Sequence, residues 1–141
     1  MIFIEKAFVM KQLNVNTSSR EEMIDITKDV QRVVKESGVL RGVCYVFTPH
    51  TTAAITINEN ADPDVPRDVI GKLQRLVPKD DGYRHVEGNS DAHIKSSLVG
   101  ASEMVMVENS TLVLGTWQSL FFCEFDGPRR RNVLVKVISE R

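Results

Sequence analysis

Two strand-like segments near the C-terminal end of the chain are apolar on both faces, which limits how the chain can fold. In residues 117–126 apolar side chains occupy both odd and even positions, and residues 132–138 repeat this pattern. Successive side chains of a strand point to opposite faces, so both faces of each strand need to be covered. A sandwich closed within one chain would cover them, as would a homo-oligomer whose sheets pack together, and we expect the oligomer.

Most of the remaining chain also has the composition of strands. Residues 2–15 are rich in Ile, Phe and Val and predict one long strand or a two-strand ribbon. Further β-branched and aromatic segments predict strands at 39–48, 53–58, 103–108 and 111–114. The sequence Asp126-Gly127-Pro128 predicts the turn between the last two strands.

Three segments have features of helices. Ser19 and Glu22 form a capping box for a first helix, which Gly38 ends. Prolines and acidic residues at 62–66 are typical of the first turn of a second helix. A polar loop at 78–90 precedes a short third helix capped by Asn89 or Ser90. The residues of this third helix that we expect to face the core are Ile94, Leu98 and Ala101.

The composition is that of an ordinary globular domain spanning residues 1–141, long enough to bury a substantial core. A formal net charge of −1 argues against a nucleic-acid-binding protein. No segment approaches the ~20 apolar residues that span a bilayer, and no basic leader precedes a long apolar stretch. We therefore expect a cytoplasmic protein without a membrane partner, in which Cys44 and Cys123 are buried reduced thiols.

All three histidines lie in polar segments that suggest one functional site. His50 follows a predicted strand, and His85 and His93 are eight residues apart. Three imidazoles could supply the protein ligands of an open catalytic zinc site, or each could be a surface or hydrogen-bonded residue. His93 lies in the first turn of its helix, which favours a neutral ring. Asp91 and Glu87 could orient the imidazoles, or could only cap the helix and face solvent.

A second set of polar groups suggests an anion site. Hydroxyl, helix N–H, ammonium and guanidinium groups of this kind can bind a phosphate or a diphosphate. The set consists of Thr51, Thr52, Ser90, Lys95, Arg129 and Arg131. The arginines could instead form a solvated turn with Glu124 and Asp126 as partners. Glu59, just past a strand end, is a candidate acid or base, with plain solvation as the alternative.

Five motifs make the chain resemble the YjbQ family, also called the secondary thiamine-phosphate synthase family. They are PHTTA at 49–53, INEN at 57–60, NSDAHIKSSL at 89–98, LGTWQ at 114–118 and EFDGPRRR at 124–131. The resemblance covers nearly the whole chain. It implies an α+β fold, a two-sheet β-sandwich of about seven strands with two to three helices, assembled as a homotrimer through its sheets.

The resemblance also implies a site and an activity. It implies a metal-binding or ligand pocket around His50, His85 and His93, with zinc as the expected divalent metal. With Glu59, these histidines are the candidate catalytic residues. The motifs extend the substrate-binding set to Asn89, Thr116 and Gln118. The implied transferase activity is that of a thiamine-phosphate synthase, which joins a pyrimidine methyl diphosphate to a thiazole phosphate and releases diphosphate. The alternatives are a metal-dependent hydrolase of a phosphorylated metabolite and a non-catalytic trimeric ligand-binding protein.

Overall fold

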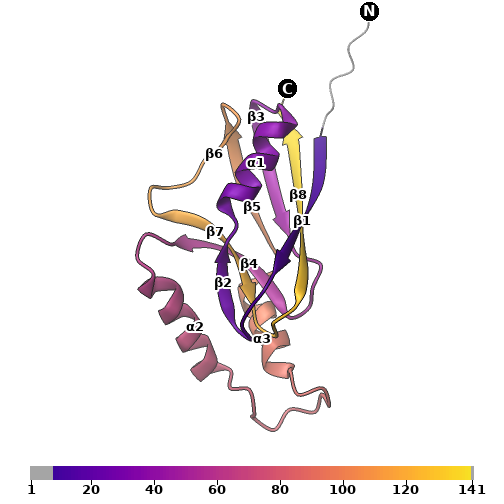
Figure 1. Cartoon of the computed structure of the whole chain (residues 1–141), viewed down its shortest axis with the longest axis vertical. Coiled ribbons are helices and arrows are strands. Elements are labelled where there is room, and N and C mark those ends of the chain that lie inside the picture. Colours follow the sequence, from indigo (N-terminus) through magenta and orange to yellow (C-terminus); the bar gives the residue numbers. More distant parts are fainter. Residues whose placement is uncertain (1–7, 141) are drawn as a thin grey trace, which may run out of the picture.

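The computed structural model describes residues 8–140, which form two antiparallel sheets and three helices (Figure 1). The five-stranded sheet contains, in order, β1 (Phe8–Asn16), β8 (Arg130–Ser139), β3 (Arg41–Phe47), β5 (Ser102–Glu108) and β6 (Thr111–Leu112). The three-stranded sheet contains, in order, β2 (Glu22–Asp25), β7 (Gln118–Glu124) and β4 (Ala53–Glu59). The helices are α1 (Thr27–Ser37), α2 (Asp64–Leu76) and α3 (Ser90–Val99). The predicted α+β fold with two sheets and helices is confirmed, with eight strands in the described part of the chain.

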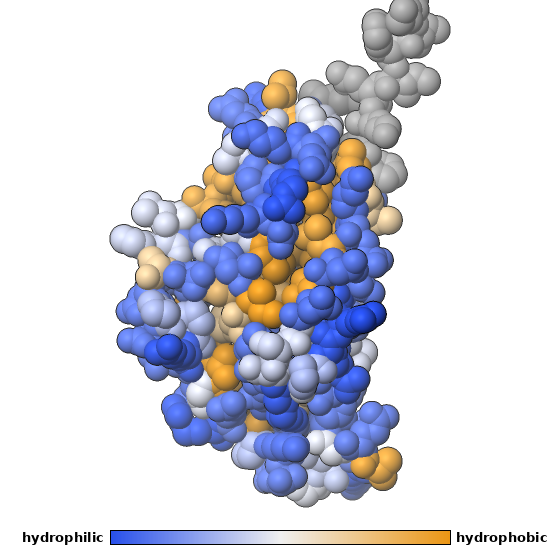
Figure 2. Space-filling view, viewed as in Figure 1, coloured by the Kyte–Doolittle hydropathy of each residue, from blue (hydrophilic) through white to orange (hydrophobic). Residues whose placement is uncertain are grey.

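The main core lies between the two sheets and includes one face of α1. From this helix Val30, Val33 and Val34 are buried, and β8 contributes the alternating Val133, Val135 and Val137. Figure 2 shows apolar residues at the surface among hydrophilic ones in the middle of the molecule. Each apolar side chain removed from water contributes about 1.5–3 kcal/mol, so this layer holds the two sheets together.

A second cluster covers the other face of the three-stranded sheet. Phe121, Cys123 and Phe125 pack there against Ala92 of α3, with Leu73 of α2 at the margin. Residues 120–125 are therefore all buried, and both apolar faces of β7 are covered within one chain. Cys44 and Cys123 are both buried and free, as expected.

The outer face of the five-stranded sheet has no such cover in one chain. Tyr45 and Phe47 of β3 and Met104 and Met106 of β5 are exposed there. We call these four side chains the outer apolar face. They belong to β3 and β5, not to residues 117–126 or 132–138, from which the sequence predicted an uncovered face. No helix among residues 8–140 is long and apolar enough to cross a membrane.

The first helix begins later than the sequence indicated. Glu22 accepts hydrogen bonds from the backbone N–H groups of Ser18 and Ser19 at 2.6 and 2.7 Å, as a capping box would. The bonds instead close a turn, because residues 22–25 pair with β7 as β2. The helix starts at Thr27, whose N–H donates to Asp25 Oδ1 at 2.9 Å. Residues 2–7 of the predicted N-terminal strand lie outside the described residues.

The predicted core face of the third helix is wrong. Ile94, Leu98 and Ala101 are exposed, whereas Ala92, Lys95 and Ser96 are buried. The physical reason is that the inward face of α3 makes polar contacts. Ser96 Oγ donates to the Ala53 carbonyl of β4 at 2.5 Å, and Lys95 is held by carboxylates.

Candidate functional site

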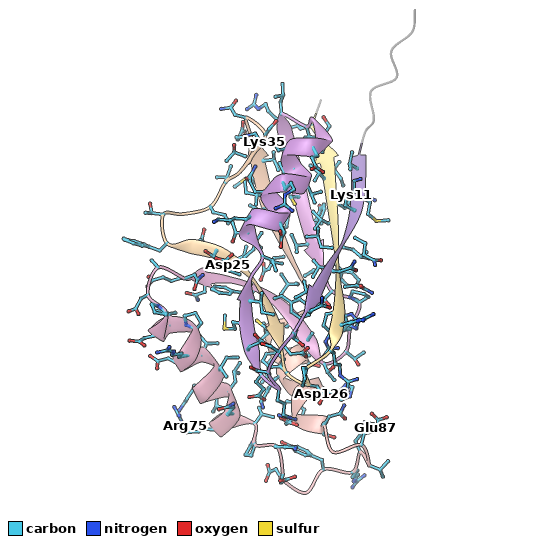
Figure 3. All side chains as sticks on the ribbon, viewed as in Figure 1. Lys11, Asp25, Lys35, Arg75, Glu87 and Asp126 are labelled. Atoms are coloured by element: carbon cyan, nitrogen blue, oxygen red, sulfur yellow. The ribbon has the colours of Figure 1, made fainter. Side chains whose placement is uncertain are left out.

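A cavity of about 410 Å³ lies where the two sheets and the N-terminal end of α3 meet, and all three histidines line it. The groups around it come from the segment between β3 and β4, the loop before α3, the first turn of α3, the turn after β7 and the start of β8. In Figure 3 the labels of Glu87 and Asp126 mark two sides of this region. The lining residues are Pro49, His50, Thr51, Thr52, His85, Glu87, Asn89, His93, Asp126, Arg129 and Arg131.

His50 is fixed by the backbone of β8. Its Nε2 accepts a hydrogen bond from the Asn132 N–H at 2.9 Å. A neutral imidazole that accepts at Nε2 carries its proton on Nδ1. Burial lowers the pKa of His50 below its usual value, and the positive charge of Arg131 lowers it further. His50 is therefore a neutral ring whose Nδ1–H can donate a hydrogen bond.

Arg131 is held beneath the cavity by a buried carboxylate. Its Nε donates to Glu124 Oε1 at 2.9 Å, and its Nη2 donates to Glu124 Oε2 and to Thr52 Oγ1. Thr17 Oγ1 donates to the same carboxylate at 2.7 Å. Burial acts to raise the pKa of Glu124, but these hydrogen bonds outweigh it and hold the pKa below its usual value. Arg131 Nη1 makes no hydrogen bond within residues 8–140, so it can donate to a ligand.

Asp126 organises the mouth of the cavity. Arg129 donates from Nη2 to Asp126 Oδ2 at 2.9 Å and from Nε to the Asp126 carbonyl at 2.8 Å. Asn89 Nδ2 donates to the same Oδ2 at 2.8 Å. Asn89 is the residue before α3, but its side chain makes no capping hydrogen bond, so the predicted side-chain cap is wrong. Its buried Oδ1 has no hydrogen-bond partner within residues 8–140.

The other two imidazoles face each other. The ring centroids of His85 and His93 are 5.3 Å apart and the ring planes are perpendicular. Glu87 Oε2 lies 3.9 Å from His85 Nε2, beyond hydrogen-bond distance, and both side chains are exposed. His93 lies in the first turn of α3, as predicted. An imidazole pair beside a carboxylate is suited to proton transfer.

Lys95 and Asp91 are not part of this cavity. Lys95 is 1% exposed, and its Nζ donates to Glu21 Oε1 at 2.5 Å and to Asp91 Oδ2 at 2.9 Å. Asp91 also accepts hydrogen bonds from both terminal nitrogens of Arg20 at 3.0 and 3.1 Å. The predicted anion-binding role of Lys95 is therefore wrong, because its ammonium is buried and neutralised. Asp91 does not orient an imidazole, because its buried carboxylate is bound by Arg20 and Lys95.

Three further predicted residues lie at the opposite end of the three-stranded sheet. Glu59 pairs with Gln118, whereas Ala53 pairs with Glu124 at the cavity end of the same strands. The two ends are about 20 Å apart at the usual rise of a strand. Thr116 and Gln118 line a turn in which Gln118 Oε1 accepts from the Gly115 N–H at 2.8 Å. Asp25, labelled in Figure 3, belongs to this far end. Glu59, Thr116 and Gln118 therefore lie away from the histidine-lined cavity in one chain.

The three imidazoles do not fit a zinc ion as they are arranged. Within residues 8–140 there is no set of three His, Cys, Asp or Glu groups close enough to hold a metal. His50 Nε2 is already used by the backbone, and a ring protonated at Nδ1 has no second lone pair for a metal. Zinc thus stays a prediction from the sequence. Elemental analysis of the protein and of a His85→Ala variant would test it.

Two residues of the site were not predicted as such. Asp126 was considered only as a partner for the arginines, although its position in the turn before Arg129 places it at the cavity. Thr17 is 107 residues from Glu124 in sequence, and no local pattern connects them.

The sequence matches the profile of a family described as UPF0047 protein YjbQ-like over residues 11–140. It is 49% identical to a UPF0047 protein of Methanocaldococcus jannaschii over 141 residues, all of both chains. It is 50% identical to the UPF0047 protein YugU of Bacillus subtilis over 131 residues, 92% of this chain and 99% of the relative.

Solved structures match in the same way. A YjbQ/UPF0047 protein of Clostridium acetobutylicum superposes with a TM-score of 0.90 at 55% identity, covering 91% of this chain and 99% of its own. A YbjQ-like protein of unknown function from Sulfolobus solfataricus gives 0.91 at 32% identity, covering 94% and 98%.

Proposed function

Because the chain belongs to the UPF0047 family of YjbQ-like proteins, we propose that it is an enzyme that acts on a phosphorylated small molecule in the histidine-lined cavity. The observation that carries this proposal is the presence of three imidazoles and two guanidinium groups around one cavity. A cavity of this size is suited to a small metabolite.

The arginines would hold the phosphate in different ways. Arg131 is locked by Glu124, so its Nη1 donates from a fixed position. The Arg129 side chain is half exposed, and within residues 8–140 its hydrogen bonds go to Asp126 alone, so it can turn toward an entering anion. The Nδ1–H of neutral His50 and the hydroxyl of Thr51 add uncharged donors. Both guanidinium groups already have carboxylate partners, Asp126 and Glu124. The additional uncharged donors therefore contribute to the binding of an anion.

More specifically, we propose that the reaction is the formation of thiamine phosphate from its two phosphorylated precursors. The C–O bond between the pyrimidine methylene and the diphosphate breaks, and the ring nitrogen of the thiazole phosphate forms the new bond to that methylene. The bonding electrons leave with the diphosphate, whose charge Arg129 and Arg131 stabilise. A proton from His85 or His93 can neutralise the leaving group, and the nearby Glu87 carboxylate would stabilise a protonated His85.

The test measures product formation from the two phosphorylated precursors by mass spectrometry. We expect Arg129→Gln and His93→Asn to reduce the rate at least tenfold. Arg75→Gln, on exposed α2, removes the same charge away from the cavity and serves as the matched control. Lack of product at high enzyme concentration would contradict thiamine-phosphate formation. Release of phosphate from single esters would then favour the hydrolase, and binding without turnover would favour a ligand-binding protein.

The assembly we propose is a homotrimer that covers the outer apolar face. The exposed Tyr45, Phe47, Met104 and Met106 support self-association, and the family resemblance supports three subunits. Light scattering of the purified protein should give three times the chain mass of 15.9 kDa. Met104→Glu should lower that mass, because it places a charge at the centre of the face. Unchanged mass in the variant would contradict this interface.

A further inference from the structure

An apolar recess of about 490 Å³ adjoins the histidine-lined cavity. It is lined by Tyr83, Arg84, His85, Ser90, His93 and Ile94. Two of these residues, His85 and His93, also line the cavity, so the two spaces meet at the imidazole pair. Most of the surface that these side chains turn to the recess is carbon, whereas the cavity is lined by charged and polar groups.

Two side chains make the recess apolar. The hydroxyl of Tyr83 donates to the Pro78 carbonyl at 2.6 Å, which leaves the carbon surface of its ring for the recess. Ile94 lies on the outward side of α3 and is 39% exposed. The core does not need these side chains, because the buried positions of this helix are Asp91, Ala92, Lys95 and Ser96. The loop before α3 and the helix itself thus present carbon to a space beside a polar site.

We propose that this recess binds the uncharged, ring-sized organic group of a phosphate ester whose phosphate lies in the cavity. The inference rests on the proposed function and adds to it a second subsite, in which Tyr83 and Ile94 determine specificity. A molecule that spans both spaces has its ester linkage beside the perpendicular rings of His85 and His93. Those rings are then placed to exchange protons with the atom that joins the organic group to the phosphate.

The expected gain in affinity follows from the area that a ring removes from water. Burying one aromatic ring corresponds to roughly a 10- to 100-fold gain in the association constant. An organic group of similar size that carries hydroxyls gains less, because the recess offers few hydrogen-bond partners for them.

Titration calorimetry on the full-length protein tests this with three probes: inorganic phosphate, phenyl phosphate and glycerol 3-phosphate. We expect phenyl phosphate to bind at least tenfold more tightly than inorganic phosphate and glycerol 3-phosphate to bind similarly to inorganic phosphate. Ile94→Ser should reduce the phenyl-to-inorganic ratio at least fivefold. Leu98→Ser, one turn further along α3 and outside the recess, is the matched control and should keep the ratio.

The outcomes separate this inference from the proposed function. Equal affinities for phenyl phosphate and inorganic phosphate would overturn the recess and leave the phosphate-binding cavity in place. An unchanged ratio in Ile94→Ser would also overturn it, because the gain would then arise elsewhere. No binding of any of the three probes would overturn the proposed function and the recess together.

Discussion

Replacing Glu124 with glutamine should destabilise the protein strongly, because its carboxylate is the only negative partner of buried Arg131 within residues 8–140. The two carboxylate oxygens accept four hydrogen bonds: two from Arg131, one from Thr17 and one from the Asp126 N–H. Glutamine keeps the size but presents an NH₂ group where one oxygen accepted. Leaving a buried charge without its partner costs about 3–5 kcal/mol. That is a large share of a typical stability of about 5–15 kcal/mol.

The measurement is urea-induced unfolding followed by circular dichroism. The matched control is Glu108→Gln, which also removes a carboxylate from an arginine, Arg41 at 3.1 Å. Both partners of that pair are exposed, so we expect a loss below about 1 kcal/mol. Removing both buried charges together, by Glu124→Leu with Arg131→Met, should cost less than Glu124→Gln alone. A Glu124→Gln loss within 1 kcal/mol of the control would refute the argument.

The pH dependence of this difference has a definite sign. The folded state lowers the pKa of Glu124, so its ionised form contributes stability above the unfolded pKa of about 4.3. That contribution is lost as the pH falls through the lower folded pKa. The difference in unfolding free energy between the wild type and Glu124→Gln should therefore shrink below about pH 4. A difference that grows on acidification would contradict it.

Three further predictions follow from buried groups. Long-range ¹H–¹⁵N spectra should show the His50 proton on Nδ1 and titration below the usual pKa, because burial and nearby arginine disfavour the cation; a proton on Nε2 would contradict the structure. Lys95→Met should cost about 3 kcal/mol in unfolding free energy because it leaves the two buried carboxylates, Glu21 and Asp91, with Arg20 as their one cationic partner within residues 8–140, while exposed Lys72→Met stays within about 0.5 kcal/mol; equal losses would contradict the buried network. Burial raises the pKa of Cys44 and Cys123 to about 12, so Ellman's reagent at pH 8 should label them only in unfolding concentrations of urea; rapid labelling of the native protein would contradict their burial.

Most strands, and the gathering of the three histidines around one cavity, could be predicted because their signals are local. Apolar residues at both odd and even positions of 117–126 indicate a strand buried on both faces, and the polar settings of the histidines follow from their neighbours in sequence. Side-chain partners far apart in the chain could not be predicted in this way. Lys95 has the sequence context of an anion-binding residue near a helix start, and only the tertiary position of Glu21 makes it a buried ion pair.

The same limit explains the two wrong helix predictions. A capping box and the four-residue turn before β2 use the same hydrogen bonds from Ser18 and Ser19 to Glu22, so local sequence does not distinguish them. The β2 pairing with residues 121–124, about a hundred positions away, decides between them. In α3 the apolar positions Ile94 and Leu98 fit a core-facing stripe, but the buried network occupies the inward face.

The anchoring of α3 has a consequence for the two facing imidazoles. His93 belongs to a helix whose Lys95 and Asp91 are tied to Arg20 and Glu21, so displacing it exposes buried charges to water. His85 lies in the loop before the helix, and its side chain makes no hydrogen bond within residues 8–140; it lies 3.9 Å from Glu87 and faces the His93 ring. One wall of the site is therefore rigid and the other is adjustable. Ligands of different widths would be accommodated by the loop, while His93 stays in place as the fixed reference for the chemistry.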